Sequence, residues 1–260
     1  MSARLLLLVI TFLVFPKQEI YSQFGFSHEI GVIAGPLAFY SDFGQRNDIK
    51  TNSGNSTIGI GLIHYINFSY RADCNCYTAD TYFNDHFKLR NEIDYHSTTL
   101  EHHGRWVASD QQGSAADYLR SMNGSTTVFE IGSQLEYFPL SIREFAASKG
   151  RLAPFISAGL HWVSYDPNIT YNEGLGLESN YYGGKYNPAT TMNNEGGNTW
   201  AVVGSVGVRY KLTKLSDLML DSRWGYYFSN WVDGLNPDVP ENKANEWIYW
   251  INFGYIYYLD

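Results

Sequence analysis

The sequence predicts an all-β fold, an eight-stranded antiparallel transmembrane β-barrel with long extracellular loops. The first observation is residues 247–259, where every odd position is apolar or aromatic, a period of two that is typical of a strand. This stretch exceeds the roughly 9 to 11 residues that a tilted strand needs to cross a bilayer. The second is composition: 44% of residues are hydrophobic, yet the mean hydropathy is −0.28, as expected when apolar and polar residues alternate. Because lipid cannot hydrogen-bond a bare strand edge, such a strand must belong to a closed barrel.

Residues 1–22 have the build of a secretory signal peptide that is cleaved from the mature chain. Arg4 precedes a short apolar run at 5–15, and Ser22 supplies a small residue at the cleavage position. This run falls well short of the roughly 20 residues that a spanning helix requires. We therefore assign residues 23–260 to one outer-membrane barrel domain. The net charge of −8 argues against a nucleic-acid partner, which would need a basic patch.

Eight segments carry the period-two pattern, each with one apolar face and one face of small, polar or charged residues. The segments are residues 29–40, 57–69, 87–95, 127–138, 152–164, 200–212, 217–228 and 247–259. In chain order, their apolar faces include Ile30 and Val32; Ile58, Ile60 and Leu62; Phe87, Leu89 and Ile93; Phe129, Ile131 and Leu135; Ile156, Leu160 and Trp162; Val202, Val206 and Val208; Leu218, Leu220 and Trp224; Phe253 and Tyr255.

The connections between these segments alternate in length, as an even-stranded barrel with its N-terminus in the periplasm requires. The predicted outward connections are 41–56, 96–126, 165–199 and 229–246, all rich in Gly, Asn, Ser and Asp. The predicted inward connections are 70–86, 139–151 and 213–216. Residues 70–86 are longer than a periplasmic turn should be, so we expect a role for them beyond barrel closure.

A soluble barrel, apolar inside and polar outside, is the competing interpretation of the same period. The lumen of eight strands is only wide enough for its own side chains, and the glycine-rich polar face suits it better than the aromatic face does. A mid-membrane Arg or Lys on the lipid face would cost about 2 to 4 kcal/mol. The polar face therefore points inward, as a balanced lumenal charge network of Lys88, Arg90, Glu92, Asp94, Glu130, Glu136, Arg209, Lys211, Asp221 and Arg223. This orientation predicts a filled lumen, lipid contact outside, and location in the outer membrane of a Gram-negative bacterium.

The sequence predicts no catalytic site, no metal site and no cofactor. Acid pairs such as Glu130 and Glu136 are better explained as parts of the lumenal network than as acid–base catalysts. The tripeptide Glu101-His102-His103 falls in a predicted external loop without a clear third and fourth metal ligand. No nucleophile elbow or phosphate-binding loop occurs. These observations favour a protein that is not an enzyme, although lumenal or rim residues of a barrel-embedded hydrolase could be scattered in sequence.

Both cysteines, Cys74 and Cys76, lie in the long inward connection. A disulfide across one intervening residue closes a strained ring, so the pair is weak support for a structural bridge. No His or Cys set with structural zinc spacing surrounds them. Two incidental thiols in a loop are the simplest interpretation, with a disulfide or a metal clip as alternatives.

Short motifs throughout the mature chain resemble those of the small PorG-like outer-membrane barrels that accompany type IX secretion and gliding machinery. They include residues 29–35 with 40–42, residues 135–139, residues 153–159 and residues 206–210. Trp231, Val232 and Asp233 are similar to that family's aromatic–aliphatic–aspartate loop before its last strand, although the family's second aspartate is Gly234 here. The resemblance implies a barrel that connects the outer membrane with periplasmic ring subunits, which would dock on residues 70–86 and 140–151.

Three functions follow as hypotheses. The first is a non-enzymatic structural or accessory barrel, such as a component of the type IX secretion system. The second is a surface-binding or adhesion barrel that uses its extracellular loops, and the third is a barrel-embedded hydrolase. A passive pore is the weakest variant, because the narrow lumen should be filled by its own side chains.

Overall fold

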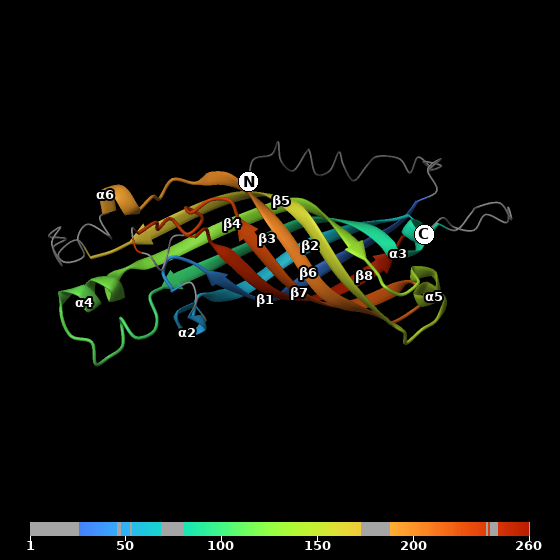
Figure 1. Ribbon diagram of the computed structural model, residues 1–260, viewed down its shortest axis with the longest axis horizontal. Coiled ribbons are helices and arrows are strands. Elements are labelled where there is room, and N and C mark those ends of the chain that lie inside the picture. The colour runs from blue at the N-terminus through green and yellow to red at the C-terminus, as the bar shows by residue number, and fades with distance from the viewer. Residues whose placement is uncertain are drawn as a thin grey trace, which may run out of the picture.

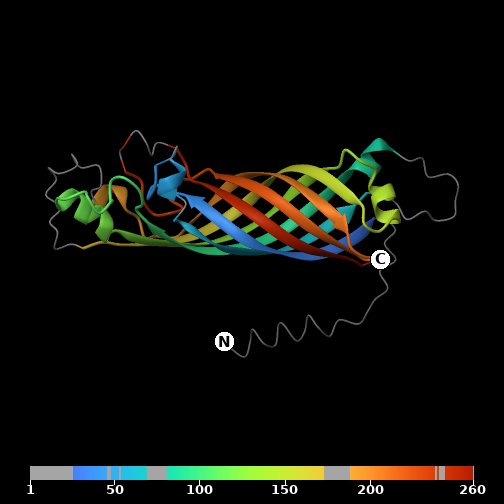
Figure 2. The same ribbon diagram turned by 90° about the horizontal axis from the view of Figure 1, so that it is seen from below.

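The computed structural model describes residues 26–45, 48–52, 54–68, 81–172, 188–237, 239 and 244–259. Eight antiparallel strands follow one another around a closed barrel in chain order, and β1 pairs with β8 to complete the ring (Figures 1 and 2). The strands are β1 Ser27–Tyr40, β2 Ser56–Asn67, β3 Phe87–Glu101, β4 Asn123–Tyr137, β5 Leu152–Thr170, β6 Gly197–Lys211, β7 Ser216–Tyr227 and β8 Trp247–Tyr258. The predicted fold class is thereby confirmed. The predicted signal peptide and the Cys74–Cys76 pair lie outside the described residues.

In the described part of the chain, five short helices lie at the two ends of the barrel. Those at one end are α2 Ile49–Asn52, α4 Ser114–Ser121 and α6 Pro188–Thr191, and those at the other end, where β8 terminates, are α3 Tyr82–His86 and α5 Ile142–Ala147 (Figure 1). The turn at 212–215 and the start of β1 also lie at the α3 and α5 end. Because outer-membrane barrels have short periplasmic turns, we assign this end to the periplasm. No helix in the described part of the chain is long and apolar enough to span a membrane.

The exterior of the barrel is a belt of apolar side chains. Leu62 is 58% exposed, Val206 55% and Phe253 60%, values that a water-soluble protein would not repeat around its whole circumference. All five Lys and Arg residues of the eight strands point into the barrel instead, where they are at most 1% exposed. This arrangement confirms that the polar face points inward, and it excludes the soluble barrel.

Strands β3, β4 and β5 extend four to six residues beyond their predicted extracellular ends. The pairing of β3 with β4 continues from Ser97↔Thr127 to Glu101↔Asn123, and β5 extends to Thr170, so the connection predicted at 96–126 is in fact 102–122. The outward side chains of this extension are polar, as in the Ser97 to Thr127 hydroxyl contact of 3.2 Å. Backbone hydrogen bonds between strands do not require apolar side chains. The pairing of β3 with β4 therefore continues beyond the point where the alternation of apolar and polar residues stops.

The interior also differs from the prediction in one respect. The sequence analysis argues that the glycine-rich polar face suits the narrow lumen better than the aromatic face, but several large aromatic residues are buried there, including Trp250, Tyr65, Phe39 and Tyr227. Glycines on neighbouring strands provide the space. A Cβ added to Gly59 would lie 2.6 Å from the Trp250 ring, and the Trp250 indole donates a hydrogen bond of 3.0 Å to the carbonyl of Gly35.

Candidate functional site

All ten charged residues predicted to line the lumen lie inside the barrel and are at most 4% exposed. Strand parity explains their placement, because alternate residues of a strand point to opposite faces of the sheet. They form one network with side chains that the prediction omits, and this network has three levels along the barrel axis. Each level joins strands that are not neighbours in the wall.

The level nearest the periplasm is organised around Arg209 of β6. Its guanidinium is 2.7 Å from Glu29 of β1 and 3.1 Å from Glu136 of β4, and it lies 4.0 Å from the centre of the Tyr65 ring. Lys88 also pairs with Glu29. Hydrogen-bonded charge pairs satisfy one another when they are removed from water together, so these contacts make the burial tolerable.

The central level contains two arginines that share carboxylates. Arg90 contacts Glu92, lies 2.9 Å from Glu136 and lies 3.3 Å from Asp221. Arg223 reaches Glu92 at 2.8 Å, Asp94 at 2.9 Å and Asp221 at 3.5 Å. Because both arginines contact Glu92 and Asp221, the removal of one leaves neither carboxylate without a cation.

The level nearest the extracellular end contains Glu130. It lies 2.9 Å from His161 Nδ1 and accepts a 2.7 Å hydrogen bond from the Tyr227 hydroxyl. Glu92, Asp94 and His161 also bring ligand-type atoms together, but the two carboxylates are already paired with arginine. The lumenal groups are therefore fixed in ion pairs and are inaccessible to a substrate.

The predicted network is incomplete, because the lumen holds two further carboxylates, Glu29 and Asp217, and the imidazole of His161. The five cations therefore face seven carboxylates, not the five that the sequence analysis counts. Parity could have found the two acids. Glu29 points to the same side of its strand as Gly31, and Asp217 points to the same side as Asp221. Both acids, however, are the first residue of a predicted segment, where the direction of a side chain is hardest to predict.

The extracellular mouth is closed by residues 229–237, here called the plug loop, which contains the predicted motif Trp231, Val232 and Asp233. Val232, Asp233 and Leu235 are all 0% exposed. The Thr126 hydroxyl of β4 donates to the Val232 carbonyl at 2.5 Å, and Leu235 forms a bridge with Met192. Trp231 itself is half-buried. The motif therefore folds into the barrel end.

Three carboxyl groups gather beside the plug loop, here called the rim carboxylates: Asp42, Asp233 and Glu246. Their oxygens lie within 4.8 Å of one another, and all three residues are buried. Backbone N–H groups of Asp42 and Leu235 donate to Asp233 at 2.7 and 2.8 Å. The sequence analysis includes only Asp233, because the other two belong to distant segments that no spacing rule connects.

Burial and mutual repulsion raise the pKa values of the rim carboxylates. Burial, together with the Asp233 carboxylate, raises the pKa of Asp42 to about 10. Burial raises the pKa of Asp233 to about 6, while its two backbone donors oppose a larger rise. The pKa of Glu246 is well above its usual range because of burial first and its two acidic neighbours second. The cluster therefore cannot keep three negative charges at neutral pH without compensation.

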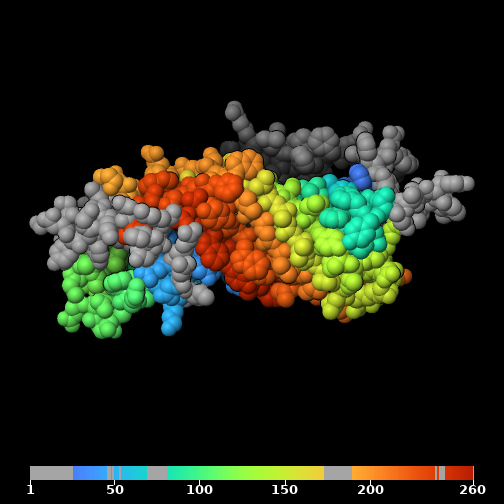
Figure 3. Space-filling model, viewed as in Figure 1, coloured from blue at the N-terminus to red at the C-terminus, as the bar shows by residue number. Residues whose placement is uncertain are grey.

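The periplasmic end is covered by α5 and flanked by α3, which pack side by side (Figure 3). Ile142 and Phe145 of α5 are 3% exposed, and they close the periplasmic end of the barrel. Around them, Tyr82 and Phe83 of α3 and the neighbouring Leu140 present a largely exposed apolar surface, here called the periplasmic apolar surface. Both predicted docking segments, 70–86 and 140–151, contribute to it.

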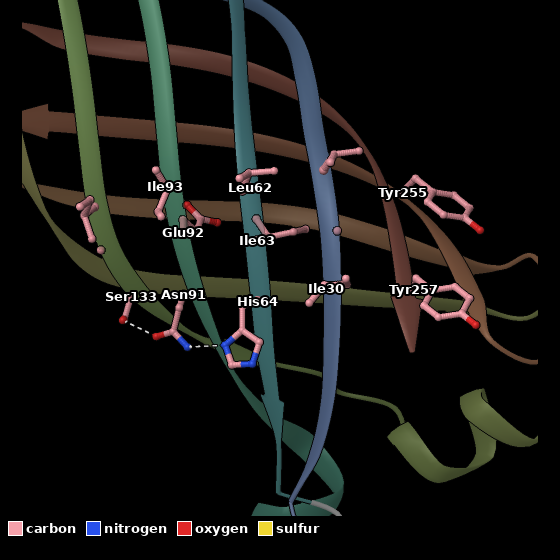
Figure 4. Close-up of a pocket in the computed structure, with 14 residues that line it drawn as sticks. Ile30, Leu62, Ile63, His64, Asn91, Glu92, Ile93, Ser133, Tyr255 and Tyr257 are labelled. Atoms are coloured by element: carbon pink, nitrogen blue, oxygen red, sulfur yellow. Dashed lines mark hydrogen bonds between the residues drawn. The ribbon is translucent and has the colours of Figure 1, made fainter. Parts of the chain in front are cut away.

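The lipid-facing wall has an apolar groove of about 740 Å³ that crosses β8, β1, β2, β3 and β4. Figure 4 shows that a line of polar side chains crosses the groove: Ser133 donates to Asn91 at 2.7 Å, and the Asn91 amide lies 3.3 Å from His64 Nδ1. His64 in turn contacts His28 at 3.1 Å. These side chains therefore satisfy one another's hydrogen-bonding groups. This is necessary because lipid offers no hydrogen-bond partners to polar groups in the wall of the barrel.

No family model matches the chain, and no curated protein is similar to it in sequence. Three solved structures show comparable folds. Neisserial surface protein A has 14% identity over 88% of this chain and 96% of its own, with a TM-score of 0.42. The outer membrane protein OprG of Pseudomonas aeruginosa is 14% identical over 89% of this chain and 97% of its own, with a TM-score of 0.40. Ail, the attachment invasion locus protein of Yersinia pestis, is 10% identical over 90% of this chain and 99% of its own, with a TM-score of 0.39.

The chain's own strand pairing, its apolar exterior and its buried lumenal charges define its class. It is an eight-stranded β-barrel of the outer membrane in a Gram-negative bacterium.

Proposed function

We propose that this barrel is a non-enzymatic structural or accessory component of an envelope machine such as the type IX secretion system. The observation that carries the proposal is the closed lumen. Buried ion pairs occupy it at three levels, the plug loop closes one mouth and α5 closes the other. A barrel of this kind transports nothing through its interior and offers no accessible acid for hydrolysis, so its function must depend on its outer surfaces.

The periplasmic apolar surface supports a docking role. Tyr82 is 62% exposed, Phe83 45% and Leu140 53%, and they come from two connections that pack against each other. The Arg143 amide donates to Asp85 of α3 at 3.1 Å, which holds the two helices together. A preformed, partly apolar surface with aromatic side chains is the usual composition of a protein–protein interface. Periplasmic ring subunits are the partners that the family resemblance implies.

A deletion strain complemented with variants tests this proposal. Wild-type protein should restore secretion of type IX cargo, and Tyr82→Asp with Leu140→Asp should not, because charges on an apolar interface are costly to desolvate. The matched control is Trp106→Asp, which changes an exposed aromatic residue at the opposite end. An affinity tag inserted at the exposed Gln112 should recover ring subunits with wild-type protein and not with the double variant. Normal secretion in a clean deletion would refute the proposal.

The surface-binding function is the second candidate, and a specific observation favours it. Strands β3, β4 and β5 extend beyond the membrane belt as a polar wall whose connection contains α4. At its edge Trp106 is 52% exposed, with the Arg105 guanidinium 4.6 Å from its ring. Deletion of residues 105–113 should abolish cell attachment while secretion stays intact. Hydrolysis of lipid or peptide by purified protein would instead support the barrel hydrolase.

A further inference from the structure

The rim carboxylates come from three segments that are joined only when the barrel closes. Asp42 follows β1, Glu246 directly precedes β8, and Asp233 belongs to the plug loop. Strands β1 and β8 are neighbours, with Tyr40 opposite Trp247, so the ends of these strands lie side by side. The ring stack of Tyr40 on Trp247, with centroids 3.8 Å apart, fixes this corner. The three side chains therefore converge on one point that is fixed by the wall of the barrel.

The carboxylate of Glu246 lacks a hydrogen-bond donor from any other residue that the structure describes. The side chain of this residue is 1% exposed, yet neither carboxylate oxygen accepts a hydrogen bond from an N–H group or a hydroxyl of another residue, and its side-chain neighbour is the carboxyl group of Asp233. Within the described part of the chain, neither Glu246 nor Asp233 is ion-paired with a Lys, Arg or His. Buried carboxylates elsewhere in this barrel contact Arg, Lys or His, as Glu29 and Glu130 do. An unsatisfied buried carboxylate beside two others is strongly unfavourable unless a ligand occupies the space between them.

The donor set indicates what kind of ligand that is. Three carboxylates supply only oxygen donors, without the imidazole or thiolate that transition metals prefer, so they suit a hard divalent cation. Two backbone N–H groups orient the Asp233 carboxylate, which is the type of outer contact that fixes metal ligands. The site lies at the extracellular end, where Ca²⁺ modules function with dissociation constants of about 10⁻⁴ to 10⁻³ M.

We propose that Asp42, Asp233 and Glu246 bind a divalent cation, Ca²⁺ or Mg²⁺, which links the plug loop to the ends of β1 and β8. The ion replaces the missing partner of Glu246 and joins three segments, adding to the Tyr40–Trp247 ring stack and the hydrogen bond from the Asp42 N–H to the Asp233 carboxylate. Closure of the extracellular mouth thereby depends on the cation content of the medium. This inference does not rest on the proposed accessory function.

The test uses the mature barrel in detergent micelles after removal of divalent ions with EDTA. Calorimetric titration with Ca²⁺ alone and with Mg²⁺ alone should show saturable binding at one site per chain. Tb³⁺ bound at the same site should luminesce when tryptophan is excited, because Trp247 is adjacent to Glu246. The Glu246→Gln variant should bind Ca²⁺ at least tenfold more weakly. The Glu101→Gln variant, which changes an exposed acid at the same end, should bind like wild type.

Two results of the binding experiments would overturn the proposal. One is an absence of saturable binding of either ion up to about 10 mM, tenfold above the weakest range expected for such sites. The other is unchanged Ca²⁺ affinity in Glu246→Gln. If that variant does not fold, Asp42→Asn serves the same comparison. Thermal unfolding of wild type that responds neither to EDTA nor to added Ca²⁺ would show that the carboxyl groups share protons, and this result also counts against the site.

Discussion

Replacement of Arg90 by Met should destabilise the barrel more than replacement of any exposed arginine. Arg90 is 0% exposed and contacts three carboxylates, with Glu136 at 2.9 Å and Asp221 at 3.3 Å, and it donates to Ser205 at 3.2 Å. Methionine is shorter than arginine by two atoms, but its flexible apolar side chain can replace the aliphatic part of Arg90 next to Phe155. The substitution therefore removes the charge and keeps an apolar side chain in its place.

The size of the effect follows from the partners that remain. Removal of one member of a buried ion pair typically costs about 3 to 5 kcal/mol. Three contacts do not multiply this cost, because Arg223 still pairs with Asp221 and Arg209 still pairs with Glu136. We therefore expect the free energy of unfolding to fall by about 3 to 5 kcal/mol. The double variant Arg90→Met with Glu136→Gln should recover part of the loss, because it removes one of the carboxylates that the arginine neutralised.

Urea unfolding of the barrel in lipid vesicles, followed by tryptophan fluorescence, measures this change. The control is Arg151→Met, because Arg151 pairs with Glu144 at 3.3 Å with side chains 50% and 75% exposed. An exposed pair of this kind contributes at most about 1 kcal/mol. If Arg90→Met unfolds within about 1 kcal/mol of wild type, or no more easily than Arg151→Met, the argument for a stabilising lumenal network is wrong.

Three further predictions concern the closed ends. Reconstituted in planar bilayers, the barrel should show no stepwise conductance, since ion pairs and both covers fill the lumen, and regular open-channel steps would contradict this. The Gly234→Ala variant should loosen the plug loop by about 1 to 2 kcal/mol, because φ is 80° and the new Cβ would lie 2.7 Å from the Asn193 carbonyl. Faster proteolysis of the folded barrel measures this change. The control is Gly204→Ala, because Gly204 has no positive φ and its new Cβ would meet only the Ser157 carbonyl, at 3.6 Å. Burial lowers the pKa of His102 to about 4, so the folded state binds fewer protons than the unfolded state. The free energy of unfolding should therefore fall by about 2 to 3 kcal/mol as the pH drops from 6.5 toward 4. The His102→Gln variant should lose this slope.

The sequence pattern predicted the fold because each strand must face two different solvents. Apolar residues such as Leu62 and Phe253 can only face lipid, and the charges of residues 87–95 can only face the lumen. Strand ends were less predictable. The extension of β3 to Glu101 consists of backbone pairs with polar side chains, and no hydrophobic alternation marks it.

The same parity predicted most of the lumenal network and missed its ends. Lys88, Arg90 and Arg223 were placed correctly because each lies inside a regular segment. Glu29 and Asp217 were missed at segment starts, and the buried Trp250 was unexpected because the space for it comes from Gly59 on another strand. Packing of this kind depends on which residues face each other across the lumen, and this is not a local property.

By itself, the sequence determined the strands, the face of each one that meets lipid and therefore the membrane location. These depend on the alternation of neighbouring residues along one segment. Only the tertiary structure decided which charges pair across the lumen, that Val232 and Asp233 close the extracellular mouth, and that Asp42 and Glu246 join Asp233. Asp42 and Glu246 stand near opposite ends of the chain, and they meet because β1 must pair with β8 when the barrel closes. Barrel closure leaves no unpaired strand edge in the lipid, and a constraint on the whole ring cannot be read from any one strand.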